Sequence, residues 1–302
     1  MRFNPKATID KGGVRDAGRG RASGGLGGIP IPSGAAGGGI GGGILIIIIF
    51  LVVQFAGGGG GGGTGTQTAT DRYNECKTGQ DANENADCAR ELVEDSLRAY
   101  WGSTLEAQTG TAFSPTEIVT FTEAVSTGGC GNASSAVGPF YCPLDKTIYL
   151  DSTFFEEVLE GQLGGNGGDF VEPYVLAHEY GHHIQNLLGT MGKVKTQQGP
   201  DSDAVRLELQ ADCYAGMWAK GAMTTTNSKG VKIFDTIDRT DIEEAIDSAK
   251  AVGDDRIQEA SGGEVDPEGW THGSAKQRVR WFETGFAAKS IKACDTFAAS
   301  QL

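Results

Sequence analysis

Glycine is distributed unevenly along the chain, and this limits how much of it can form a packed core. The 302 residues include 48 glycines, which crowd the first third in runs at 37–39, 41–43 and 57–63. Such stretches have no side chains to bury and lose much conformational freedom on ordering, which is typical of linkers. From residue 71 onward the composition is that of an ordinary globular domain. We therefore predict a folded domain over residues 71–302, which is long enough for a sizeable core.

An apolar segment, ILIIIIFLVVQFA at residues 44–56, lies between the glycine runs. Counted from Ile40 it has seventeen residues, close to the lower limit for a membrane-spanning helix. A cleaved signal peptide is the alternative, although no small-x-small cleavage site follows. The expected organisation has four parts: a basic, Gly-rich cytoplasmic segment at 1–39, a single transmembrane anchor at 40–56, a Gly/Thr-rich linker at 57–70 and the domain at 71–302.

Charge sets the orientation that we expect for this anchor. Six basic and two acidic residues precede it, so the positive-inside rule places the N-terminus in the cytoplasm and the domain outside the cell membrane. Removing these from the 25 basic and 39 acidic residues of the chain leaves 19 and 37 beyond residue 56, a net charge of −18. A domain this acidic repels phosphate backbones, so we expect no nucleic-acid partner. The sequence does not indicate an oligomeric state.

The six cysteines all lie in the predicted domain, and none forms a C-x-x-C pair. A zinc knuckle is therefore not supported, and an even number of cysteines in an exported domain suggests disulfides. Sequential pairing is the simplest of the fifteen possible schemes. It gives Cys76–Cys88, Cys130–Cys142 and Cys213–Cys294.

Hydrophobic periodicity predicts mostly helices. Apolar residues at helical spacing predict helices from about residue 86 and over 152–159, 171–188, 202–220, 241–252 and 274–288. Alternating and β-branched residues predict strands over 116–125 and 147–150. Pro173 in the first turn and Gly189 at the end mark the limits of the central helix. The expected class is α+β, mostly helical, with a small sheet before that helix.

Three of the four histidines fall within residues 178–183, where His178, Glu179 and His182 form H-E-x-x-H. Residues four apart share one face of a helix, so both imidazoles can reach the same ion. Imidazole is a good zinc ligand, and Glu179 lies next to the first ligand, where it can act as a base. A catalytic zinc site needs a third protein ligand and an open position.

The segment RLELQADCYAGMWA at 206–219 offers that third ligand. Glu208 and Asp212 lie on one helical face, so Glu208 can bind the metal while Asp212 accepts a hydrogen bond from a ligating histidine. A solvated acidic pair is the alternative. The extended motif H-E-x-x-H-x-x-G-x-x-H fails, because Gln185 and Leu188 occupy its last two defined positions. His183 points about 100° away from the ligand face, so we expect it to pack or hydrogen-bond.

Four blocks together resemble the bacterial neutral zinc metallopeptidase family. They are HEYGHHIQ, RLELQADCYAGMWA, THGSAKQRVRWF at 271–282 and CGNASSAVGPFYCPLDKTIYLD at 130–151, and the resemblance covers roughly residues 72–290. It implies a zincin-like fold with one zinc ion on His178, His182 and Glu208, and Glu179 as the catalytic base. In zincins a strand before the active-site helix pairs with extended substrate, and KTIYL at 146–150 is our candidate for this edge strand, with an ordinary strand of the sheet as the alternative.

The expected activity is that of a zinc metalloendopeptidase acting on protein or peptide substrates. Zinc lowers the pKa of a water that it binds toward about 7. Glu179 would take a proton from this water and deliver it to the leaving amine. His272 is the candidate for stabilising the oxyanion, with Tyr149 or Tyr180 as alternatives. Arg278 is a candidate partner for a carboxylate near the site.

Two other functions use the same motif. One is a surface binding or scaffold protein with a structural zinc site, and the other is a zinc amidase acting on cell-wall peptides. A structural site is usually closed by a fourth protein ligand, most often cysteine. Cys213 points about 100° away from the face of Asp212, which favours the open, catalytic site.

Overall fold

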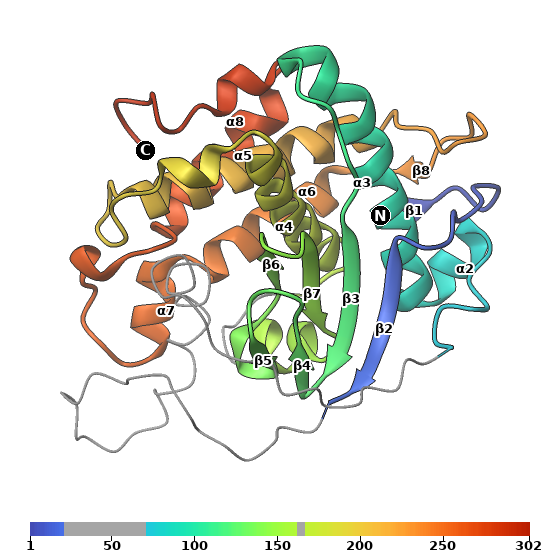
Figure 1. Cartoon of the computed structure of the whole chain (residues 1–302), viewed down its shortest axis with the longest axis horizontal. Coiled ribbons are helices and arrows are strands. Elements are labelled where there is room, and N and C mark those ends of the chain that lie inside the picture. Colours follow the sequence, from blue (N-terminus) through green and yellow to red (C-terminus); the bar gives the residue numbers. More distant parts are fainter. Residues whose placement is uncertain (21–70, 162–166) are drawn as a thin grey trace.

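The computed structural model describes residues 1–20, 71–161 and 167–302 (Figure 1). The fold is α+β and zincin-like, as predicted. Its longer helices are α2 (Gly79–Glu84), α3 (Ala86–Thr109), α4 (Val171–Leu187), α5 (Asp203–Ala222), α6 (Arg239–Ala251), α7 (Asp254–Ala260) and α8 (Ala275–Ala287). A short π-helix, η4 (Phe155–Glu160), occupies most of the predicted helix at 152–159.

The main sheet has four strands in the order β2-β3-β7-β6. β2 (Val14–Arg19), β3 (Glu117–Thr122) and β7 (Thr147–Asp151) are parallel, and β6 (Phe140–Cys142) is antiparallel to β7. Two smaller pairs are β1 (Arg2–Phe3) with β8 (Phe234–Thr236) and β4 (Ala124–Ser126) with β5 (Asn132–Ser134).

The prediction that residues 146–150 form an edge strand is wrong. β7 hydrogen-bonds to β3 on one side and to β6 on the other, so both of its edges are occupied. Sequence alternation identifies a strand but not its neighbours, because pairing partners come from distant parts of the chain. The strand at this edge of the described sheet is β6, which also contacts α4.

The central helix α4 contacts strand β6 of the sheet and the helices α3, α5 and α6 (Figure 1). Pro173 is in its first turn, and Gly189 follows its end with a positive φ of 70°, as the sequence predicted. Most of its residues are buried, including all three histidines. A helix buried on every side is rigid, which suits it to hold side chains in a fixed geometry.

Helices α5 and α8 make the closest helix pair. A Cβ added at Gly216 would lie 2.1 Å from the Phe282 carbonyl oxygen, and one at Gly285 would lie 1.8 Å from the Cys213 carbonyl oxygen. The two backbones therefore approach closely only because glycine stands at both crossing points. The approach lies at Phe282 and Gly285, in the second half of α8, against Cys213 and Gly216 of α5.

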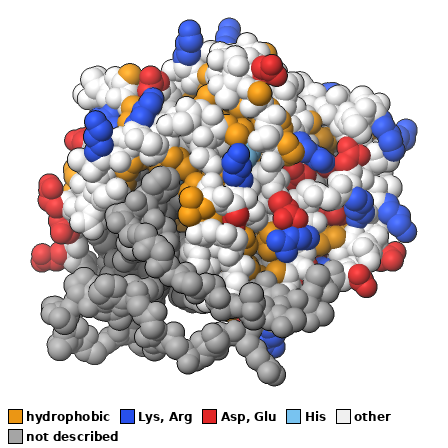
Figure 2. Space-filling view, viewed as in Figure 1, with side chains coloured by type: hydrophobic (Ala, Val, Ile, Leu, Met, Phe, Trp, Pro, Cys, Tyr) orange, Lys and Arg blue, Asp and Glu red, His pale blue; other side chains and the backbone are white. Residues whose placement is uncertain are grey.

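The first twenty residues of the predicted cytoplasmic segment at 1–39 are instead part of the domain. Residues 1–20 supply β1 and β2, and β2 extends the main sheet beside β3 (Figure 1). The basic charge of this segment meets acidic partners of the domain: Arg15 with Glu117 at 2.9 Å, Lys11 with Glu91 at 2.9 Å, and Arg19 with Glu123. On the face drawn in Figure 2, basic and acidic side chains are correspondingly interspersed.

The predicted membrane topology is therefore wrong. A single span after residue 39 would put residues 1–20 and the domain on opposite sides of a membrane, yet they share one hydrogen-bonded sheet. Across the described ranges, no helix combines the length and the apolar character needed to cross a membrane. The predicted anchor at 40–56 and linker at 57–70 lie outside the described residues.

The predicted cysteine pairing is confirmed. The three disulfides are Cys76–Cys88, Cys130–Cys142 and Cys213–Cys294. The third is fully buried and joins α5 to the 3-10 turn η7 (Ile291–Cys294) near the C-terminus.

Candidate metal centre and active site

Three predicted ligands meet at one point in the interior. His178 and His182 lie one turn apart on α4, and Glu208 faces them from α5. Their ligand atoms all lie within 4.8 Å of one another. Glu208 Oε2 is 3.1 Å from His178 Nε2, and Glu208 Oε1 is 3.5 Å from His182 Nε2. All three side chains are buried.

The other ring nitrogen of each histidine is held by an oxygen. His178 Nδ1 lies 2.8 Å from Asp212 Oδ1, and His182 Nδ1 lies 2.8 Å from Gln185 Oε1. These oxygens can only accept, so each Nδ1 carries the hydrogen. Each Nε2 of a neutral ring then presents a lone pair toward Glu208, which is the form of imidazole that binds metals.

This arrangement fits a divalent cation. His182 Nε2 is buried and has no hydrogen-bond partner, and His178 Nε2 faces a carboxylate oxygen. Without a metal, His178 can bind a proton in its place. Burial lowers the pKa of His178, but Asp212 and Glu208 outweigh this effect and raise the pKa to about 10. Burial likewise opposes ionisation of Glu208, yet His182 and His272 hold its pKa well below the usual range. Two imidazoles and one carboxylate are the ligand types of catalytic zinc sites.

Glu179 lies next to this cluster without belonging to it. Its side chain is buried, and Oε2 has no hydrogen-bond partner. Burial raises the pKa of Glu179 above the usual value, an effect that the neighbouring His182 and His178 partly offset. A buried carboxylate with a raised pKa and a free oxygen has the properties of a general base.

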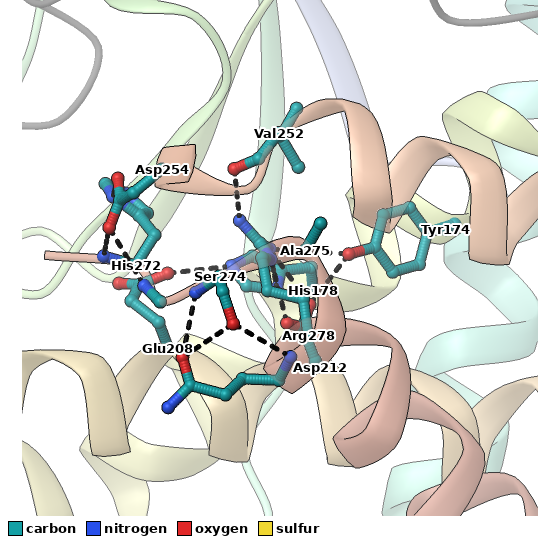
Figure 3. A network of polar contacts seen from close by, with 12 residues as sticks. Tyr174, His178, Glu208, Asp212, Val252, Asp254, His272, Ser274, Ala275 and Arg278 are labelled. Carbon is teal, nitrogen blue, oxygen red and sulfur yellow. Dashed lines mark hydrogen bonds and ion pairs between the residues drawn. The ribbon is translucent and has the colours of Figure 1, made fainter. Parts of the chain in front are cut away.

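Asp212 is the centre of a buried polar network (Figure 3). Besides His178, it accepts hydrogen bonds from Tyr174 Oη at 2.7 Å and from Arg278 through Nε and Nη2, both at 2.9 Å. Burial raises the pKa of Asp212, but Arg278 and His178 outweigh this and lower it. The carboxylate therefore stays ionised and can orient the His178 ring.

His272 lies at the edge of the same cluster, on the loop between α7 and α8 (Figure 3). The loop is organised by Asp254, whose Oδ2 accepts from the backbone N–H groups of Thr271, His272 and Gly273 at 2.7–2.9 Å. His272 Nδ1 lies 2.9 Å from Thr271 Oγ1 and 3.5 Å from Asp254 Oδ1. Burial lowers the pKa of His272, but Glu208 and Asp254 raise it above the usual value.

Comparison with known proteins supports this interpretation. A family model described as "Putative neutral zinc metallopeptidase" matches residues 5–297. The chain belongs to this family. The match begins at residue 5, well before the resemblance expected from residue 72, and it includes β2, in agreement with the place of this strand in the main sheet.

Relatives occur in Mycobacterium tuberculosis and Escherichia coli. The uncharacterized protein Rv2575 of Mycobacterium tuberculosis is 48% identical over 231 residues, which cover 76% of each chain. The uncharacterized protein YpfJ of Escherichia coli K12 is 40% identical over 206 residues, which cover 66% of this chain and 67% of the relative. No solved structure matches.

Three other predicted residues lie away from the cluster. His183 accepts from Tyr141 Oη at 3.0 Å and donates to the Ser114 carbonyl at 2.7 Å, which confirms that it hydrogen-bonds. Its pKa is lowered to about 4 by burial. The Tyr149 hydroxyl donates to Asp145 at 2.8 Å. The Tyr180 hydroxyl is buried and has no hydrogen-bond partner among the described residues, and burial together with the charge of Glu94 raises its pKa.

Sequence reasoning missed Tyr174, Gln185 and Asp254. Tyr174 is four residues before His178 and Gln185 is three after His182, so helical spacing alone places each beside a ligand. Asp254 carries no such signal, because it is eighteen residues before the loop that it holds.

Proposed function

We propose that this protein is a zinc-dependent endopeptidase acting on protein or peptide substrates. The observation that carries the proposal is the buried His178, His182 and Glu208 cluster beside a carboxylate, Glu179, that has an unpartnered oxygen. When bound, zinc supplies a Lewis acid that polarises the carbonyl of the substrate and makes water a stronger acid.

The residues of the chain supply the proton transfers. Glu179 Oε2 is free to take a proton from the attacking water and then to deliver it to the leaving amine. The raised pKa of Glu179 brings it closer to neutral pH, where both steps become easier. His272, whose Nδ1 is held by Thr271 and Asp254, would donate through its other nitrogen to the developing oxyanion.

A purely structural zinc site is less well supported. Such sites are closed by four protein ligands, most often including cysteine. Among the described residues, this cluster has three possible ligands, His178, His182 and Glu208. Cys213, the cysteine nearest to Glu208 in the sequence, forms a disulfide with Cys294. Three protein ligands leave the fourth position of a zinc ion open, as a catalytic site requires.

Substitution of Glu179 tests the proposal. In the full chain, Glu179→Gln keeps the shape of the side chain but removes the base, so cleavage of unfolded proteins and peptide mixtures should fall by roughly 10²–10⁴-fold. Zinc content should not change, because Glu179 is not a ligand. Glu283→Gln, at an exposed position of α8, is the matched control and should retain full activity.

Two results would contradict the proposal. One is undiminished cleavage by Glu179→Gln. The other is a folded, zinc-loaded wild-type protein that cleaves none of these substrates, which would favour a structural or non-peptidase site.

A further inference from the structure

The two histidines of the metal centre are held by chemically different partners. His178 donates to a carboxylate, Asp212, whereas His182 donates to a neutral amide, Gln185. An amide can be turned over so that its NH₂ group faces the ring instead of its oxygen. The hydrogen-bonding pattern at Gln185 therefore decides whether His182 can bind a metal through Nε2.

Two backbone carbonyls determine this pattern. Gln210 Nε2 lies 2.8 Å from the Cys294 carbonyl oxygen, which only accepts, so Gln210 Oε1 must face the other way. There it meets Gln185 Nε2 at 3.2 Å. The same Nε2 donates to the Leu207 carbonyl at 2.6 Å. Gln185 Oε1 is then left for His182 Nδ1.

The chain of amides ends at the metal centre. Because Gln185 Oε1 accepts, His182 Nδ1 must be the protonated nitrogen, and Nε2 must carry the lone pair. His182 Nε2 is the buried atom without a partner, 3.5 Å from Glu208 Oε1. Gln185 is fully buried and Gln210 nearly so, hence water does not offer either amide an alternative partner.

The other end of this chain of amides, at Gln210, is also fixed. Cys294, whose carbonyl accepts from Gln210, is bonded to Cys213 on α5, three residues beyond Gln210. The disulfide keeps this carbonyl beside α5. If the carbonyl moved away, the Gln210 amide would lose the contact that sets its orientation.

We propose that Gln185 and Gln210 form a relay that positions His182 as a metal ligand, with Gln210 acting through Gln185. This inference rests on the proposed zinc centre. If the Gln185 amide turned over, its NH₂ group would face Nδ1 and favour the tautomer with a hydrogen on Nε2, which cannot bind the ion. Both glutamines are positioning residues, since neither reaches the metal or the substrate.

Zinc affinity of the full chain tests the relay. Competition with a chromogenic chelator gives the zinc Kd of the wild type, Gln185→Met, Gln210→Met, the double variant and Gln198→Met, a control at an exposed position. Methionine keeps the length of glutamine but removes its amide. Loss of a partner that orients a ligand typically costs about 10–100-fold in metal affinity, which is the rise in Kd expected for Gln185→Met. Gln210→Met should raise the Kd by less, about tenfold at most, and the control should not change it.

The double variant separates a relay from two independent effects. If Gln210 acts through Gln185, the double variant should have the Kd of Gln185→Met alone. A Kd raised by the product of the two single effects would overturn the relay, and so would an unchanged Kd for Gln185→Met. A folded wild-type chain that binds no zinc would instead refute the metal centre, and the relay with it.

A measurement on the wild-type protein avoids any folding defect of the variants. Nitrogen-15 NMR of the histidine side chains distinguishes protonated from unprotonated ring nitrogens. In the zinc-loaded protein, His182 Nδ1 should carry a hydrogen and Nε2 should bind the metal. The opposite assignment would overturn the proposal whatever the variants show.

Discussion

Removal of Arg278 should destabilise the fold more than loss of almost any other ion pair. Arg278 is 3% exposed and Asp212 is 0% exposed, and two hydrogen bonds of 2.9 Å join them. Arg278→Met fills a similar volume but leaves Asp212 as a buried carboxylate without its positive partner. Breaking a buried pair in this way costs about 3–5 kcal/mol. Solvent does not screen this pair, so the full range applies.

Urea unfolding of the metal-free protein measures this cost. With a slope of about 3 kcal/mol per molar urea, the unfolding midpoint should fall by roughly 1 M or more. Removing both charges in Asp212→Asn/Arg278→Met should restore most of the lost stability, because neither partner is then left buried and unpaired. Arg239→Met is the matched control: its partner is Glu243 and its side chain is 92% exposed, so no measurable shift is expected.

The reasoning would be refuted if Arg278→Met shifted the midpoint no more than Arg239→Met does. It would also fail if the double variant were less stable than Arg278→Met alone. Either result would mean that the Asp212 carboxylate finds adequate hydrogen bonds from Tyr174 and His178 without the guanidinium.

Two further variants test other parts of the structure. Glu94 is buried, both of its carboxylate oxygens lack hydrogen bonds, and burial raises its pKa to about 8. The native state therefore keeps a proton that the unfolded state releases near the ordinary pKa of 4.5. The free energy of unfolding should then fall as pH rises between these two values. Glu94→Gln should flatten this decline in thermal unfolding scans from pH 5 to 9, whereas a decline of unchanged slope would contradict the assignment. Gly285→Ala would bring a methyl group 1.8 Å from the Cys213 carbonyl oxygen and force α8 away from α5, so its unfolding temperature should fall, with an expected cost of about 1–3 kcal/mol or more. Gly102→Ala meets only Phe113 at 3.6 Å and should be neutral or stabilising; equal losses for both variants would show that the close helix approach is not the cause.

The part of the site that sequence predicted is local. His178, Glu179 and His182 lie within five residues of one helix, so helical geometry alone brings them together. Glu208 and Asp212 share a face of α5 for the same reason. Only the pairing of the two helices had to be assumed, and the chemistry of the ligands suggested it.

The part that sequence missed depends on contacts between distant residues. Composition indicated that residues 1–20 were a separate basic segment, but their charges meet acidic residues about a hundred positions away, such as Glu117. β2 pairs with β3 across that distance, and a local pattern carries no information about such a partner. Asp254 was missed for the same reason, because the groups that donate hydrogen bonds to it are backbone N–H groups of a loop eighteen residues further along the sequence.

The metal content of the full chain tests the central claim most directly. The wild type, supplied with zinc and dialysed, should retain one zinc ion per chain by elemental analysis, and His178→Ala/His182→Ala should retain none while its disulfides and helical content persist. A folded wild type that retains no zinc, or a double variant that retains as much as the wild type, would contradict the claim that this cluster is the metal centre.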